Sequence, residues 1–156
     1  MNIKLETTIN RPIDKVWDVL GNQFGEAHKW TSILKHSEGS GKTISNQVCE
    51  SRTCDINGMG RVHEKIHEFN SDKFVLKYEV VEGFPFFVKS GLNTWQLKTE
   101  GNATKVFVNA EITTTGFVGF LMAPMMKMQM NGMMGKFIEE LKYYFENGKP
   151  HPRKSK

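Results

Sequence analysis

Residues 95–110 read WQLKTEGNATKVFVNA, two runs of alternating apolar and polar residues joined by Gly101-Asn102. A two-residue turn with glycine in the first position suits a type II′ β-hairpin. Because the turn sets the register, Trp95 is expected to pair with Val108. Successive side chains of a strand point to opposite faces. The stretch therefore predicts an antiparallel hairpin with one apolar face, made of Trp95, Leu97, Val106, Val108 and Ala110.

Short β-forming runs separated by Gly, Asn, Asp and Ser fill the chain upstream of this hairpin, a pattern typical of an antiparallel meander. After a first strand at the N-terminus, strands are expected near 33–38, 46–56, 60–69, 73–82, 88–99 and 103–114. Tyr78 alternates with polar residues on an apolar face shared with Phe74, Leu76 and Val80. For strand 60–69 two registers stay open, and the favoured one sets the Glu64 carboxylate inward between Val62 and Ile66.

A long final helix is expected over 117–147, followed by Gly148-Lys149-Pro150. Seven of the nine methionines fall between Met122 and Met134, and unbranched, polarizable methionine makes an adaptable apolar wall. Pro124 is expected to kink or divide the helix. The expected apolar stripe consists of Leu121, Met125, Met128, Phe137, Ile138, Leu141 and Phe145. The expected polar side consists of Lys127, Lys136, Glu139, Glu140 and Lys142.

The remaining features place a helix between the first strand and the meander and a basic segment at the end. Asn10-Arg11-Pro12 predicts a helix start, and a second short helical piece is expected at 26–30. One domain over residues 1–148 is expected, followed by a flexible basic tail over 149–156. Four basic residues in that tail account for the net charge of +4, so the body is formally neutral and no nucleic-acid partner is expected.

Composition and the N-terminal sequence set expectations about location. No apolar run approaches the roughly 20 residues that span a bilayer, so a soluble protein is expected. The first residues alternate like a strand and lack the features of a secretory leader, which favours the cytoplasm. Cys49 and Cys54 lie five apart in one expected strand and point to opposite faces, so no disulfide between them is expected.

Motifs for other chemistries are weak, and neither a metal nor a cofactor is expected. Residues 38–43, EGSGKT, are similar to the end of a phosphate-binding loop, but His36 stands where that loop requires glycine. On one strand His63 and His67 would be about 13 Å apart, too far to share an ion. The methionines interleave with phenylalanines and have no cysteine neighbour, which disfavours copper. No serine or cysteine has the base partner of a nucleophile.

Taken in order, several residues resemble the START-like (SRPBCC) superfamily, specifically its polyketide cyclase/dehydrase branch. They are Arg11-Pro12, Val16-Trp17, Trp30, Gly58, Gly60, Glu64, Tyr78, Trp95-Gln96-Leu97 and Ala123-Pro124. The resemblance covers nearly the whole chain. It implies an α+β helix-grip fold of the Bet v 1 type, with a curved seven-stranded antiparallel sheet around the long C-terminal helix, in the order β-α-α-β6-α. It also implies a cavity for apolar compounds, whereas chemistry varies among members.

The leading interpretation is a monomer or weak dimer that binds a small apolar molecule, such as a lipid or aromatic polyketide, between sheet and helix. The expected ligand-binding residues are Tyr78, Trp95, Val108, Asn109, Met125, Met128 and Phe137. Arg52 and Glu64 are expected either to orient the polar end of the ligand or to form a structural ion pair across strands. An alternative is a cyclase or dehydratase in which Glu64 acts as general acid or base and Arg52 or Tyr78 stabilises an enolate oxygen. A second alternative treats 84–87, FPFF, with the start of the last helix, as a surface for transient membrane or partner contact.

Overall fold

Seven segments of alternating polarity form one antiparallel sheet in the computed structural model, which describes residues 1–155. The strands are β1 (Asn2–Ile9), β2 (Leu34–Ser45), β3 (Val48–Ile56), β4 (Gly60–Asn70), β5 (Val75–Glu82), β6 (Val88–Glu100) and β7 (Ala103–Thr114). The helices are α1 (Ile13–Trp17) and α2 (Gly116–Asn147), with a π-helical turn η1 (Asp18–Asn22) and 3₁₀ turns η2 (Phe24–Lys29) and η3 (Pro152–Ser155). The strand order is β1-β7-β6-β5-β4-β3-β2, so every strand after β1 pairs with its neighbour in sequence.

The predicted β6–β7 hairpin is confirmed in its register. Trp95 pairs with Val108, and Gly101 has the positive φ of +60° that a glycine-first turn requires. The five residues of its predicted apolar face are all at most 2% exposed. Strand β5 starts two residues later than expected, since Phe74 has a positive φ of +54° and lies outside the ladder.

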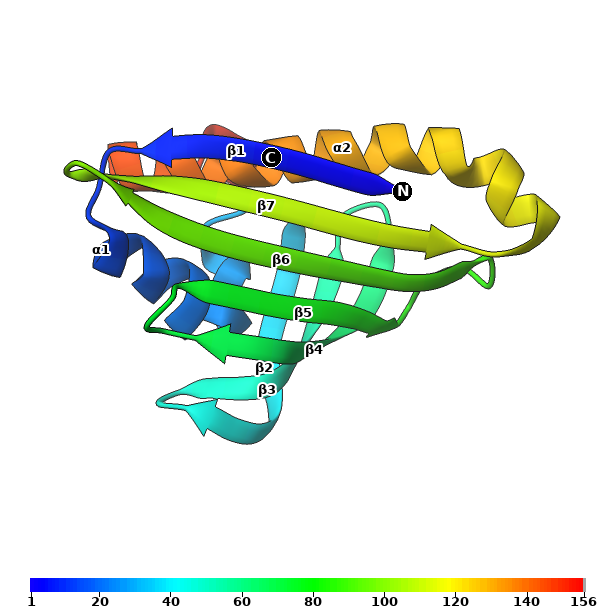
Figure 1. The fold of residues 1–156 in the computed structure, drawn as a ribbon, viewed down its shortest axis with the longest axis horizontal. Coiled ribbons are helices and arrows are strands. Elements are labelled where there is room, and N and C mark those ends of the chain that lie inside the picture. The colour runs from blue at the N-terminus through cyan, green and yellow to red at the C-terminus, as the bar shows by residue number, and fades with distance from the viewer. Residues whose placement is uncertain (156) are drawn as a thin grey trace.

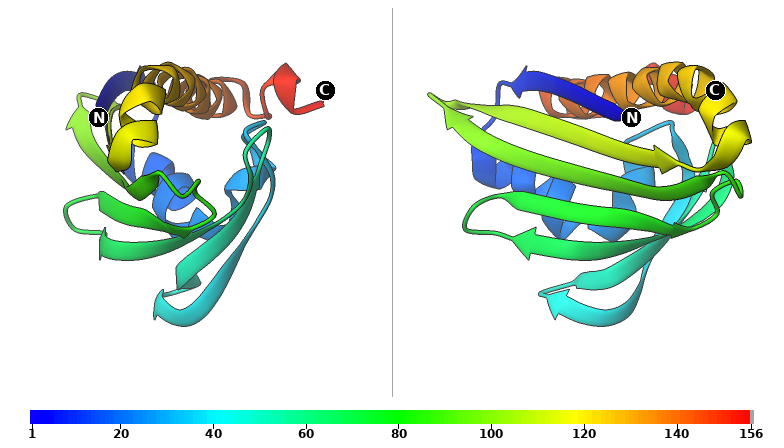
Figure 2. Two further views of the ribbon diagram at one scale, coloured as in Figure 1. Left: turned by 90° about the vertical axis from the view of Figure 1, so that its right-hand side faces the viewer. Right: turned by 45° about the vertical axis from the view of Figure 1, so that its right-hand side comes forward.

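The sheet curls so that α2 lies across its open side, as the end-on view shows (Figure 2, left). Helix α1 with η1 and η2 fills one end of the concave face (Figure 1). Trp17 and Phe24 from these short elements are buried against that face. The arrangement is the expected α+β helix-grip architecture, with a core between the inner face of the sheet and α2.

Helix α2 is one continuous helix whose first turns bend away from the rest and extend beyond the ends of the strands (Figures 1 and 2). Pro124, which lacks the N–H of the helical ladder, lies inside α2 and does not divide it. The predicted stripe is correct only in its second half. Phe137, Ile138 and Leu141 are buried, whereas Leu121, Met125 and Met128 are 59%, 43% and 71% exposed. Among the described helices, none is long and apolar enough to span a bilayer.

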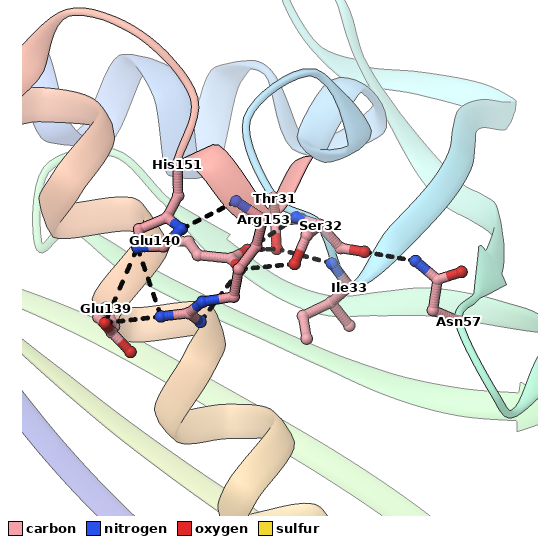
Figure 3. A network of polar contacts seen from close by, with 8 residues as sticks. All are labelled: Thr31, Ser32, Ile33, Asn57, Glu139, Glu140, His151 and Arg153. Atoms are coloured by element: carbon pink, nitrogen blue, oxygen red, sulfur yellow. Dashed lines mark hydrogen bonds and ion pairs between the residues drawn. The ribbon is translucent and has the colours of Figure 1, made fainter. Parts of the chain in front are cut away.

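The described part of the basic tail contacts α2 and the start of β2. Arg153 forms ion pairs with Glu139 at 2.6 Å and with Glu140 at 3.3 Å (Figure 3). Lys154 donates to the Leu34 carbonyl. Glu140, predicted on the polar side of the helix, is completely buried and also accepts from Thr31 and Ser32. Its buried charge needs donors, which the returning chain supplies. Lys156 lies outside the described residues.

Candidate functional site

A cavity of about 50 Å³ lies between the inner face of the sheet and α2. Its lining includes Arg52, Val62, Glu64, Tyr78, Val80 and Asn93 from the strands, and Met130, Met133, Met134 and Phe137 from the helix. One water molecule occupies about 30 Å³ of liquid, whereas ligand pockets are typically about 300–1,000 Å³. Any larger guest must therefore displace side chains from this space.

The central polar feature of the cavity is a buried ion pair between Arg52 and Glu64. The two residues are register partners on β3 and β4 and are 4% and 6% exposed, so the predicted inward Glu64 and its pairing with Arg52 are both confirmed. Arg52 also donates to the Phe24 carbonyl at 2.7 Å, and its guanidinium lies 3.9 Å from the centre of the Phe24 ring. These contacts hold the cation in one place beside the cavity.

The groups around the pair remain in fixed protonation states near neutral pH. Burial disfavours the charged form of Arg52, but the Glu64 carboxylate raises its pKa above the usual value. Burial raises the pKa of the Cys54 thiol to about 12, and the thiol lies 3.6 Å from Glu64. Burial, and then the charge of Glu64, also raises the pKa of Tyr78. Cys54 and Tyr78 are therefore neutral at pH 7.

Asn93 is a cavity residue that the sequence interpretation missed, whereas the predicted Asn109 does not line this cavity. Asn93 pairs with Tyr78 on β5, is 9% exposed, and its Oδ1 is buried with no hydrogen-bond partner among residues 1–155. Asn109 follows inward-facing Val108, so it points to the outer face, where it donates to Glu111 at 2.9 Å. The period of two that places Trp95 inward also places Asn93 inward.

The methionine wall is real, but its members differ from those predicted. Met125 and Met128 are exposed and do not line the cavity, whereas Met130, Met133 and Met134 do. With 3.6 residues per turn, Met128 lies roughly 180° around the helix from Phe137. By the same count the three lining methionines lie within about 60° of Phe137.

The other predicted lining residues are all in the core, at different depths. Tyr78 and Phe137 line the main cavity and also a void of about 10 Å³ deeper in the core, which Trp95 lines too. Val108 is buried on the inner face but does not line the cavity. The structure thus gathers Arg52, Glu64, Tyr78 and Phe137 around one space, with Trp95 behind it.

The cavity adjoins a surface groove on one side and the β5–β6 loop on another. A surface groove of about 490 Å³ between α2 and the β3–β4 turn shares Ile33, Met59, Met130 and Met133 with the cavity. On another side, Phe84 of the β5–β6 loop covers Gly91. A Cβ atom at Gly91 would lie 2.5 Å from the Phe84 ring, so glycine is needed for this close approach.

Within residues 1–155 no group of three or more His, Cys, Asp or Glu side chains is arranged to hold a metal ion. Both cysteines are free. The acid–base roles considered for Glu64 and Arg52 stay predictions.

Comparison with known proteins agrees with this architecture. The model of the family described as polyketide cyclase / dehydrase and lipid transport matches residues 2–146. No curated protein matches the chain. Among solved structures, XoxI from Bacillus cereus is 18% identical, with 96% of this chain and 99% of that one covered and a TM-score of 0.75. A START superfamily protein from Mycobacterium smegmatis is 11% identical, with coverage of 93% and 97% and a TM-score of 0.76. Ara h 8.0201 is 16% identical, with coverage of 94% and 97% and a TM-score of 0.68.

Proposed function

Since the chain belongs to the polyketide cyclase/dehydrase and lipid transport family, we propose that it binds a small, largely apolar molecule in the cavity between the sheet and α2. The observation that carries this proposal is a void bordered by three methionines where the sheet faces α2. Methionine side chains repack at low cost, so a guest can enlarge this space by displacing them. Arg52, Glu64 and Asn93 would contact the polar end of the guest.

Opening of the surface groove offers a route for the guest. Ile33, Met59, Met130 and Met133 border the groove on one side and the cavity on the other. Movement of these side chains would join the two spaces without breaking a strand pair. The bound state is thus expected to differ from the present one mainly in methionine rotamers.

Binding without chemistry is the function that we favour over the cyclase or dehydratase alternative. For proton transfer, Glu64 would have to share or leave its bond with buried Arg52. Breaking such a pair leaves an uncompensated buried charge. A ligand can instead contact the intact pair from the cavity.

Cavity binding can be tested by a substitution on β5 that fills the cavity. Val80→Phe places a larger side chain in the space, whereas Val81→Phe on the next residue points outward, where Val81 is 45% exposed. We expect the neutral probe N-phenyl-1-naphthylamine to gain fluorescence with the unaltered chain and with Val81→Phe. Its affinity should fall at least about tenfold with Val80→Phe, which corresponds to 1.4 kcal/mol. Equal affinities of the two variants, or no probe binding by the folded chain, would refute cavity binding.

A second candidate function, docking to an anionic membrane, is favoured by an exposed apolar surface at one end of the molecule. This apolar end is defined by Phe86, Phe117, Phe120, Leu121, Met125 and Met128, which are between 43% and 84% exposed. Its two parts adjoin, because the Thr115 amide donates to the Phe87 carbonyl at 2.8 Å. On α2, Phe117, Leu121, Met125 and Met128 follow one another at intervals of four, four and three, and Phe120 adjoins Leu121, so they share one side of the helix.

The positive charges near the apolar end favour an anionic lipid surface as its partner. Residues 112–128 contain Lys127 but no Asp or Glu, and residues 83–90 contain Lys89 and again no acid. Aromatic side chains beside lysines suit the boundary between headgroups and acyl chains of an anionic bilayer. Each lysine near such a surface contributes about 1 kcal/mol. The same loop carries Phe84 over the cavity, so docking would place the membrane beside the cavity cover.

Vesicle co-sedimentation tests this candidate with phosphatidylcholine vesicles that contain or lack a quarter phosphatidylserine. We expect binding to the anionic vesicles that weakens in 0.5 M salt and falls at least about tenfold in the double variant Phe86→Ser/Phe120→Ser. Ile44→Ser, at an exposed residue on β2, is the matched control. Unchanged binding of the double variant would contradict the proposal. The proposal would also be contradicted if the unaltered chain bound no vesicles and formed a dimer while the double variant was a monomer. A second copy of the chain would then cover the surface.

A further inference from the structure

The polar groups of the cavity restrict which ligand it can hold. Asn93 brings an amide oxygen that is buried and lacks a hydrogen-bond partner among the described residues. A buried acceptor without a donor costs free energy, and a ligand that supplies the donor recovers it. The residue lies on the inner face beside Tyr78, within the lining of the cavity.

The charges of the cavity are already balanced. Arg52 is the single cation of the lining and Glu64 the single anion, and they pair with each other. Arg52 also donates to the Phe24 carbonyl and lies over its ring. A ligand carboxylate would therefore have to share Arg52 with Glu64 and would lie near a second buried negative charge. Such an uncompensated charge is unfavourable in an apolar interior.

From these two features we infer that the ligand is uncharged and bears a hydroxyl group that donates a hydrogen bond to Oδ1 of Asn93. This inference rests on the proposed cavity binding and adds the chemical class of the guest, an apolar alcohol or phenol as opposed to a fatty acid or other carboxylate. The apolar body of the ligand lies against Val62, Val80 and the three lining methionines. A hydroxyl suits this position since it donates and stays neutral at pH 7.

Three compounds of one shape but different polar groups provide the test. 2-Naphthol, 2-methylnaphthalene and 2-naphthoate are titrated against the complex with N-phenyl-1-naphthylamine at pH 7. We expect 2-naphthol to bind at least about tenfold more tightly than either of the others, since only it supplies an uncharged donor. In Asn93→Leu the advantage over 2-methylnaphthalene should disappear while the affinity for 2-methylnaphthalene is kept or improved.

The controls separate this inference from the proposed function. Asn109→Leu, on the outer face of β7, should leave all three affinities unchanged. Equal binding of 2-naphthol and 2-methylnaphthalene, or tighter binding of 2-naphthoate, would overturn the inference but leave cavity binding in place. An unchanged preference in Asn93→Leu would also overturn it. Failure of every compound and of the probe would instead refute cavity binding itself. If Asn93→Leu does not fold, Asn93→Ala provides the same comparison, since alanine also lacks an acceptor.

Discussion

Replacing Glu64 with leucine is expected to lower the free energy of unfolding by about 3–5 kcal/mol, because Arg52 would remain buried without its counter-charge. The loss should exceed that of an ordinary surface substitution, since both partners are nearly inaccessible to water. Urea unfolding followed by the fluorescence of Trp17, Trp30 and Trp95 measures it. All three tryptophans are buried, so their emission reports loss of the core.

The same two strands supply a matched control for this experiment. Asp55 and Arg61 also pair between β3 and β4, at 3.0 Å, but Arg61 is 75% exposed. Asp55→Leu should leave the unfolding midpoint nearly unchanged, because water screens an exposed pair. The double variant Arg52→Met/Glu64→Leu should recover most of the loss, since no unpaired charge then stays buried. Equal losses from Glu64→Leu and Asp55→Leu, or no recovery in the double variant, would mean that the buried charge is not the cause.

The alternation of apolar and polar residues along the strands accounts for most of what could be predicted of the fold. It placed Trp95 and Val108 inward and, through a turn with glycine first, paired them in the observed register. Glu64 was harder because the turn after β4 does not determine the register. Irregular pairing between β4 and β5 explains this difficulty, since the ladder shifts on either side of Glu64 and Ile66.

Two site residues could have been placed correctly by applying the same periods throughout. Asn109 lies between two inward-facing residues and so must face outward, whereas Asn93 shares the parity of Trp95. On α2, Met128 lies roughly opposite Phe137, and Glu140 lies about 60° from it. Carboxylates usually lie on the polar side of a helix, so the residue type of Glu140 predicts exposure although the side chain is buried.

Contacts between distant parts of the chain could not be predicted by any local period. Glu140 bonds to residues 31 and 32, more than 100 positions earlier, and to Arg153 in the returning C-terminal segment (Figure 3). The size of the cavity is equally non-local, since it depends on how methionines of α2 pack against residues of six strands. Sequence patterns indicate that a wall of methionine faces the sheet, but they do not indicate how much space is left.

Glu140→Gln is expected to lower the free energy of unfolding by at least about 3 kcal/mol, because the side chain is completely buried and surrounded by donors. Its Oε2 accepts from the Thr31 hydroxyl and the Ser32 amide, both at 2.7 Å, and its Oε1 accepts from the Ser32 hydroxyl at 2.5 Å. An amide offers one acceptor oxygen, so its NH₂ group would face donors in the place of the second. Thermal and urea unfolding measure the loss.

Glu139, the preceding residue on α2, provides a control for the effect of burial. It also pairs with Arg153, at 2.6 Å, but its side chain is 60% exposed. Glu139→Gln should therefore cost less than about 1 kcal/mol. Arg153→Gln should cost an intermediate amount, because Glu140 keeps its bonds to Thr31 and Ser32 while losing a charged donor. If Glu139→Gln and Glu140→Gln were equally harmful, the returning C-terminal segment would stabilise the fold through surface charge. A large loss confined to Glu140 would instead show that the helix is attached to the start of β2 through one buried carboxylate, beside the groove where we propose that ligands enter.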